Sequence, residues 1–91
     1  MKKANNNIFI DMYPSVDMHG LDRESARVLT DDFVKENIKL GNKKIIIIHG
    51  KGSHIVKQSV HQELNKNQYV EDYKLDNFND GITVVSLKVD K

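Results

Sequence analysis

The sequence contains no cysteine and no tryptophan, and only one of its 91 residues is proline. Without cysteine the chain cannot form disulfide bonds or thiolate metal sites, so we expect no disulfide partner. No apolar run approaches the roughly 20 residues that span a bilayer, and the chain does not open with the pattern of a secretory signal. These absences predict a cytoplasmic protein with no membrane partner.

An excess of charge of one sign is also missing. Fourteen lysines and arginines stand against 13 acidic residues, which gives a formal net charge of +1. The whole molecule therefore has little attraction for a polyanion, and any binding of nucleic acid needs a local group of basic residues. With 38% hydrophobic and 30% charged residues the composition predicts one small globular domain with a single core.

The most apolar stretch is the run of four isoleucines at residues 45–48. Short, β-branched and apolar, it predicts a strand that is covered on both faces in the middle of a sheet. It is followed directly by His49-Gly50-Lys51-Gly52-Ser53. We therefore expect the strand to end in a polar loop at the edge of the sheet, where open α/β folds bind their ligands.

Two helices flank this strand. Apolar residues keep a helical spacing between Asp22, a suitable N-cap, and Gly41, a suitable C-terminal stop. After the polar loop, Val56, Val60 and Leu64 follow one another at intervals of four residues, which predicts a second amphipathic helix.

Three further strands complete the expected fold. Residues 16–19 form a short strand before the first helix, 69–75 an edge strand, and 82–89 the last strand. The prediction is an α/β two-layer sandwich of βαβαββ order, with a four-stranded mixed sheet and two helices, in which the final hairpin is antiparallel.

The domain is expected to span residues 16–91. Residues 1–15 form an N-terminal extension, which we expect to be either flexible or an extra strand over 8–13. Crossovers between parallel strands are right-handed and usually join neighbours, so strands 16–19 and 44–48 should end at the same edge of the sheet. Asp17 and His19 should therefore approach His49 and its loop.

Three motifs carry a resemblance to a known family. The segment Val16-Asp17-Met18-His19-Gly20-Leu21 is similar to Leu-Asp-x-His-Gly-Leu, His49-Gly50-Lys51-Gly52 matches His-Gly-x-Gly, and Gly81-Ile82-Thr83-Val84-Val85 resembles Gly-x-Thr-x-Val. In this order they resemble the small MutS-related (Smr) domain from Val16 to Leu87. The chain lacks the mismatch-repair ATPase region to which some Smr domains are fused, so we expect a stand-alone form.

The resemblance implies a fold similar to the C-terminal domain of a translation initiation factor. It also implies DNA-nicking or RNA-cleaving activity, as in several members, or binding of RNA or ribosomes, as in others. One departure from the family pattern is His54, which stands where a small residue, often glycine, commonly follows the second motif.

His19 and His49 are the candidates for general acid and base, because imidazole can hold or release a proton near neutral pH. Asp17 could fix a histidine tautomer or help to hold a divalent metal. The simpler alternatives are that Asp17 caps a turn and that His49 only makes hydrogen bonds across the strand ends. Two histidines and one carboxylate could ligate a transition metal, yet no HxH or HExxH spacing is present. Activity with Mg²⁺ and activity without a cofactor both stay open.

The loop Gly50, Lys51, Gly52 and Ser53 could hold a phosphate, since glycines let backbone amides approach an anion and the following helix offers its positive end. The simpler alternative is an ordinary turn. Further basic side chains could line the same edge or merely be solvated: Lys57, Arg23, Lys43, Lys44 and Arg27. His54 and His61 share one face of the second helix, for which we expect a solvated surface. Phe78 is a candidate for base stacking.

Two hypotheses follow. The first is a small Smr-type endonuclease, a phosphodiester hydrolase acting on RNA or on structured or single-stranded DNA. The second is a non-catalytic module that binds nucleic acid or the ribosome through the same loop. A small-molecule nucleotide-binding protein is a weaker third, because the sequence shows no recognisable base pocket. Whether alanine at His19 abolishes turnover or only changes affinity separates the first two.

Overall fold

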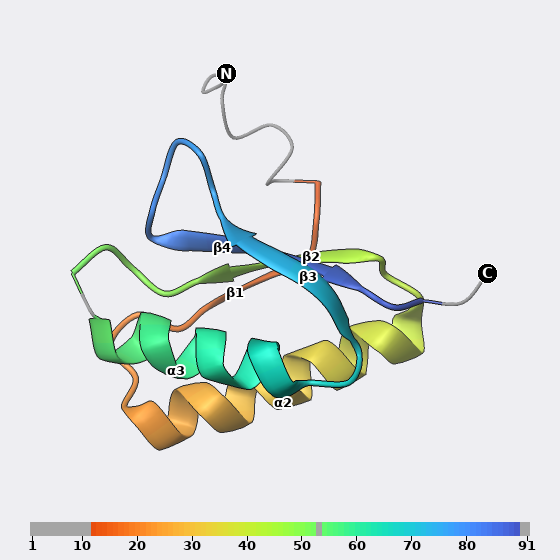
Figure 1. Cartoon of the computed structure of the whole chain (residues 1–91), viewed down its shortest axis with the longest axis horizontal. Helices are drawn as coiled ribbons and strands as arrows, with labels where there is room; N and C mark the ends of the chain where they lie inside the picture. The colour runs from red at the N-terminus through yellow and green to blue at the C-terminus, as the bar shows by residue number, and fades with distance from the viewer. Residues whose placement is uncertain (1–11, 53, 90–91) are drawn as a thin grey trace.

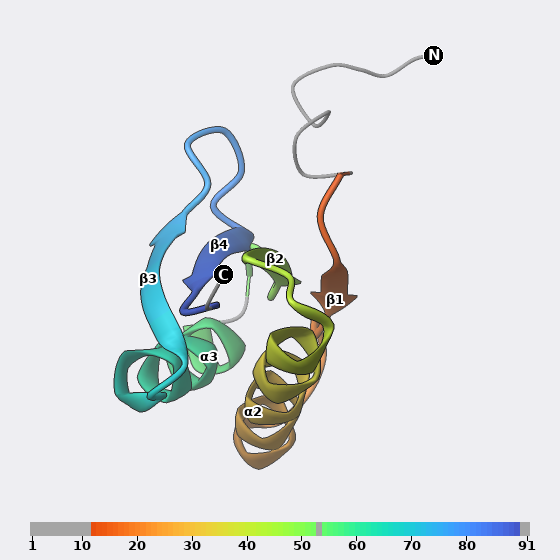
Figure 2. The ribbon, with the colours of Figure 1, turned by 90° about the vertical axis from the view of Figure 1, so that its right-hand side faces the viewer.

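The computed structural model describes residues 12–52 and 54–89. In this part the elements follow the order β1 (Ser15–Asp17), α2 (Arg23–Leu40), β2 (Lys44–Ile48), α3 (His54–Lys66), β3 (Val70–Leu75) and β4 (Ile82–Leu87). Both helices cover the same face of the sheet (Figures 1 and 2). The predicted two-layer α/β sandwich of βαβαββ order is confirmed.

The sheet is mixed, with the strand order β1-β2-β4-β3. β1 and β2 pair in parallel, whereas β4 runs antiparallel to β2 and to β3. The final hairpin is therefore antiparallel, as predicted. Ile45, Ile46 and Ile47 are all fully buried, as expected for a strand in the middle of a sheet, although both helices lie on one face.

Local sequence signals set the ends of α2. The Asp22 side chain accepts a hydrogen bond of 2.8 Å from the Ser25 amide, and Gly41 adopts the left-handed φ of 78° that a C-terminal stop requires. Neither helix of the described ranges is long and apolar enough to cross a membrane.

The first strand is shorter than predicted. β1 ends at Asp17; the Met18 amide still donates to the Ile48 carbonyl at 2.7 Å, but His19 already lies in a turn. Most of the predicted N-terminal extension, residues 1–11, lies outside the described residues, and with it most of the possible strand over 8–13. Its last two residues, Met12 and Tyr13, occupy a turn and a bend.

Neighbouring isoleucines of β2 allow a test of which face carries the core. Ile47 belongs to the core cluster under the helices, whereas Ile48 points to the other face and is only partly buried. Ile47→Ala should lower the free energy of unfolding by about 2–5 kcal/mol through lost burial and the cavity left behind. Urea denaturation of Ile47→Ala and Ile48→Ala measures the difference; an equal or larger loss for Ile48→Ala would contradict this placement of the core.

Candidate functional site

The carboxyl ends of β1 and β2 bring His19 next to Gly50. A β-carbon built on Gly50 would lie 3.3 Å from the His19 Cβ, and Gly50 has a φ of 86°, which glycine adopts readily and other residues rarely do. Two motifs that are 30 residues apart in the sequence therefore meet at one edge of the sheet.

Asp17 holds the His19 side chain in a fixed orientation. The Asp17 Oδ1 atom lies 2.7 Å from the His19 Nδ1 atom and also accepts the His19 backbone amide at 3.0 Å. The side-chain hydrogen bond raises the pKa of His19 above its ordinary value and, with the backbone hydrogen bond, lowers that of Asp17. With Nδ1 occupied and a side-chain exposure of 74%, His19 presents Nε2 to solvent.

His49 faces the opposite way. His49 is fully buried. Its Nε2 atom lies 2.8 Å from the Thr83 hydroxyl oxygen, and its Nδ1 atom lies 3.2 Å from the Gly50 carbonyl oxygen. Burial lowers the pKa of His49. Asp17 pairs with Ile48 and so lies on the other face of the sheet. The expected convergence of both histidines and Asp17 therefore does not occur: the strand ends meet, but the His49 ring enters the core.

His61 shares the Thr83 hydroxyl with His49. Its Nε2 atom lies 2.7 Å from the same Oγ1 atom, and the two imidazole centroids are 5.7 Å apart. A hydroxyl carries one proton, so it can donate to only one of the two rings and must accept from the other. If His49 donates from Nδ1 to the Gly50 carbonyl, its Nε2 accepts from Thr83, and His61 then donates from Nε2.

The expectation of a solvated helix face for both histidines of α3 is thus wrong for His61 and correct for His54. His54 is exposed, whereas His61 is partly buried against Thr83 and Tyr73. Burial lowers the pKa of His61 to about 4.

The loop after β2 is held by the Gly81 carbonyl, which accepts the amides of His49 at 2.9 Å and Gly50 at 3.0 Å. The Gly50 amide is therefore already used and cannot also bind a phosphate in this conformation. The amides of Lys51 and Gly52 have no hydrogen-bond partner among the described residues. Ser53 lies outside the described residues.

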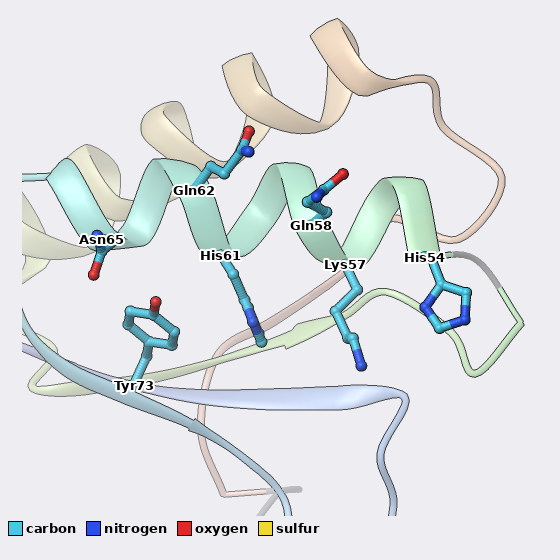
Figure 3. A pocket seen from close by; sticks show the side chains of 7 residues that line it. All are labelled: His54, Lys57, Gln58, His61, Gln62, Asn65 and Tyr73. Carbon is cyan, nitrogen blue, oxygen red and sulfur yellow. The ribbon is translucent and has the colours of Figure 1, made fainter.

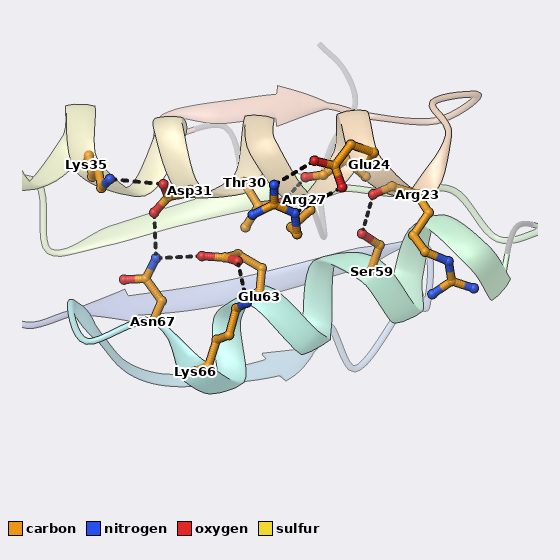
Figure 4. Close-up of polar contacts among 11 residues, drawn as sticks. Arg23, Glu24, Arg27, Thr30, Asp31, Lys35, Ser59, Glu63, Lys66 and Asn67 are labelled. Atoms are coloured by element: carbon orange, nitrogen blue, oxygen red, sulfur yellow. Dashed lines mark hydrogen bonds and ion pairs between the residues drawn. The ribbon is translucent and has the colours of Figure 1, made fainter.

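The basic residues that could line this edge do not all lie there. Lys51 is exposed on the loop, Lys57 projects from α3 toward the neighbouring strands (Figure 3), and Arg23 extends beside the first turns of α3 (Figure 4). The expectation that Lys43 and Lys44 line this edge is wrong, because Lys44 begins β2 and His49 follows its other end. Arg27 forms an ion pair of 2.6 Å with Glu24.

A metal centre has no support in the described ranges. No three histidine or acidic side chains there form a group that could hold a metal ion. The two-histidine, one-carboxylate arrangement considered from the sequence fails because His49 and Asp17 lie on different faces of the sheet.

Sequence reasoning missed three residues that shape the loop: Gly81, Thr83 and His61. A β-carbon on Gly81 would come within 3.0 Å of the Gly50 carbonyl carbon and 3.1 Å of the Lys51 amide nitrogen. Gly81 and Thr83 stand in the third family motif, where glycine and threonine could have been taken as a signal for close backbone approach and a buried hydroxyl. For His61, only its spacing from Val60 and Leu64 on the helix hinted at burial.

The family model described as "Smr domain" matches residues 16–88. The chain belongs to the Smr family. "Endonuclease MutS2" of Clostridium acetobutylicum is 39% identical over 77 residues, and its namesake in Clostridium novyi is 34% identical over the same length; each match covers 81% of this chain. The chain spans about a tenth of the length of these relatives.

Two solved structures share the fold of this Smr domain. The crystal structure of the Smr domain of Thermus thermophilus MutS2 is similar with a TM-score of 0.77 and 28% identity, covering 81% of this chain and 96% of that one. YdaL, a stand-alone small MutS-related protein from Escherichia coli, gives the same TM-score at 24% identity and covers 96% of this chain and 79% of that one.

Removing the Asp17 charge should change the protonation of His19 directly. In Asp17→Asn we expect the pKa of His19 to fall toward its ordinary value of 6.5, because the hydrogen-bonded carboxylate stabilises the imidazolium. NMR titration of the His19 ring protons measures this without any substrate. Asp22→Asn, which removes a nearby charge but keeps the helix cap, should leave the His19 titration as in the wild type; an unshifted His19 in Asp17→Asn would contradict the pairing.

The buried His61 predicts a loss of stability in acid. Its folded-state pKa of about 4 lies below the ordinary 6.5, so between these values the unfolded chain binds the proton more tightly and the free energy of unfolding falls as pH falls. At 1.36 kcal/mol per pKa unit, and reduced for partial exposure, His61 should account for about 1–2 kcal/mol of this loss.

Urea unfolding at pH 7 and pH 4.5 checks this expectation. The loss between the two pH values should be smaller in His61→Gln than in the wild type. His54→Gln makes the same exchange at an exposed position of α3 and should keep the wild-type difference. Equal losses in all three proteins would show that His61 does not titrate as a buried neutral ring.

Proposed function

We propose that this Smr domain is an endonuclease that cleaves phosphodiester bonds in RNA or in structured or single-stranded DNA. The observation that carries the proposal is the exposed His19, oriented by Asp17 and placed against Gly50 at the start of the glycine loop. The two Clostridium relatives described as endonucleases support it, through a region that makes up about a tenth of their length.

His19 is the proton-transfer group in this proposal. Because Asp17 raises the pKa of His19, the ring is more protonated near neutral pH than an unpaired histidine. It therefore acts as the general acid, donating its Nε2 proton to the oxygen that leaves phosphorus when water or a ribose 2′-hydroxyl attacks. The attacking water or 2′-hydroxyl releases its own proton to solvent, and the histidine returns to its starting state by taking a proton from solvent.

The scissile phosphate binds at the loop. The amides of Lys51 and Gly52 point to no internal partner in the described structure, and the Lys51 side chain adds a positive charge. The N-terminal end of α3 contributes its dipole, and Arg23 and Lys57 extend the positive field to either side. Gly50 contributes because it lacks a β-carbon, which lets His19 approach, and Ser53, which lies outside the described residues, stays a candidate from the sequence alone.

His49 acts indirectly in this proposal. With both ring nitrogens engaged inside the protein, it serves to position the loop by binding the Gly50 carbonyl and Thr83. It is therefore a positioning residue in this proposal, and the role in proton transfer expected for His49 from the sequence does not apply.

The burial of His49 also favours the second candidate function. A site with one exposed histidine in place of two has lost half of the expected acid and base pair, which fits a module that binds nucleic acid or the ribosome without cleaving it. Both candidates use the same loop, and the part played by Mg²⁺ is decided by the experiment below.

Cleavage of labelled single-stranded and stem-loop RNA, and of matched DNA, tests the proposal. Product formation by the wild type should fall at least about 100-fold in His19→Ala, the usual range for loss of a general acid, while binding of the uncut substrate is retained. Parallel reactions with magnesium and with a chelator show whether a divalent ion takes part. The rate should also decrease as pH rises through the pKa of His19, and Asp17→Asn should move this decrease to lower pH.

Lys39→Ala is the control, since it removes an exposed side chain in the last turn of α2, away from the loop and the groove, and should leave the rate unchanged. If the wild type cuts none of the substrates while it and His19→Ala retard the RNA equally, the endonuclease proposal is wrong and the binding module takes its place.

A further inference from the structure

A groove of about 560 Å³ lies between α3 and β3, beyond the loop that holds the proposed phosphate site (Figure 3). Its volume falls within the range of about 300–1,000 Å³ that is common for small-ligand sites. The lining combines three carboxamides, two partly buried rings, one exposed histidine and one lysine. These residues are Gln58, Gln62, Asn65, His61, Tyr73, His54 and Lys57.

The chemistry of this lining selects a class of ligand. A carboxamide offers both donors and an acceptor, so the three of them can match the mixed donor and acceptor edge of a nucleobase. The groove has no acidic lining residue among those described, which argues against a cation as its ligand. We propose that the groove binds one unpaired base of the strand whose phosphate occupies the loop, an inference that rests on the proposed function.

Two rings form the inner wall. The centroids of His61 and Tyr73 are 5.0 Å apart with their planes tilted by 46°, and the Tyr73 hydroxyl points from β3 toward α3, near Asn65 (Figure 3). A flat heterocycle can stack on such a wall whatever its sequence. With His61 donating from Nε2 to Thr83, its Nδ1 atom is left as an acceptor.

The groove is connected to the loop in two ways. α3 begins at His54, immediately after the loop, and the carboxamides at positions 58, 62 and 65 lie progressively further along the same side of the helix. From residue 54 to 65 an α-helix rises about 16 Å. The second connection is the Thr83 hydroxyl, which is bonded both to His61 in the groove wall and to His49, whose ring contacts the Gly50 carbonyl.

The arrangement favours single-stranded substrates. In a duplex each base is paired and its polar edge is occupied, so it cannot enter a groove lined with carboxamides unless it is first unpaired and turned out. A single strand can instead place its phosphate on the loop and the adjoining base beside α3. The groove therefore narrows the substrate class of the proposed endonuclease to nucleic acid with an unpaired base next to the bound phosphate.

Binding measurements on the full chain test this inference. Fluorescence anisotropy compares three oligonucleotides of equal length: a single-stranded RNA, its fully paired duplex, and an abasic strand. The double variant Gln58→Ala/Gln62→Ala should bind the single strand about tenfold more weakly than the wild type, as expected for the loss of two hydrogen bonds. Its affinity for the abasic strand and the duplex should be unchanged.

Two control variants separate the groove from the phosphate site. Gln68→Ala removes an exposed carboxamide outside the groove and should bind all three oligonucleotides as the wild type does. Lys51→Ala should weaken binding of all three, because it removes a phosphate contact. If Lys51→Ala has no effect on any of them, the proposed phosphate site is wrong. If Lys51→Ala weakens binding but the double variant binds the single strand normally, the groove inference alone is wrong.

An NMR measurement on the wild type tests the same inference without a variant that could misfold. In the wild type, the side-chain amide NMR signals of Gln58, Gln62 and Asn65 should shift on addition of the single-stranded RNA and stay in place with the abasic strand. Shifts of equal size with both would mean that the groove responds to the phosphate backbone, and this would overturn the assignment to a base.

Discussion

The Gly81 carbonyl holds the candidate site together. This single acceptor binds the amides of both His49 and Gly50, and so joins the loop after β2 to the start of β4. The two segments lie so close together that a β-carbon on Gly81 would clash with the backbone atoms of Gly50 and Lys51. The turn at Gly50 and the position of Lys51 depend on this contact.

The two histidines at this turn have different environments. His19 remains at the surface with its orientation set by Asp17, whereas His49 lies in the core and binds Thr83. A polar group in the core must be satisfied, and the chain of hydrogen bonds from the Gly50 carbonyl through His49 and Thr83 to His61 satisfies each member in turn. The proposed surface chemistry thus depends on a polar network underneath the loop, which positions the loop and has no part in the proposed proton transfer.

The sequence was sufficient for the fold because its signals are local and agree with one another. The isoleucine run, the cap at Asp22 and the stop at Gly41 each specify one element, and the crossover rule then places β1 beside β2. The side of the sheet on which His49 lies could also have been read from the alternation with Ile45 and Ile47. That His61 would reach the same hydroxyl could not, because it depends on how α3 rotates and packs against β4, which no local pattern specifies.

The groove was out of reach for the same reason. The spacing of Gln58, Gln62 and Asn65 shows that they share a side of α3, but only the packed structure places Tyr73 of β3 opposite them. The sequence contains no recognisable base-binding motif, but motifs do not reveal a groove that two separate elements form together.

The outer edge of β3 could pair with a strand of a second copy of this molecule. An edge strand exposes unpaired backbone groups that can recruit a strand from another molecule. β3 carries a register shift between Val70 and Asp72, and its exposed side chains Glu71, Asp72 and Lys74 are all charged. Pairing two such edges would force desolvation of these charges and would have to accommodate the bulge. The charges and the bulge of β3, the strand that contributes Tyr73 to the groove, therefore oppose pairing through its edge.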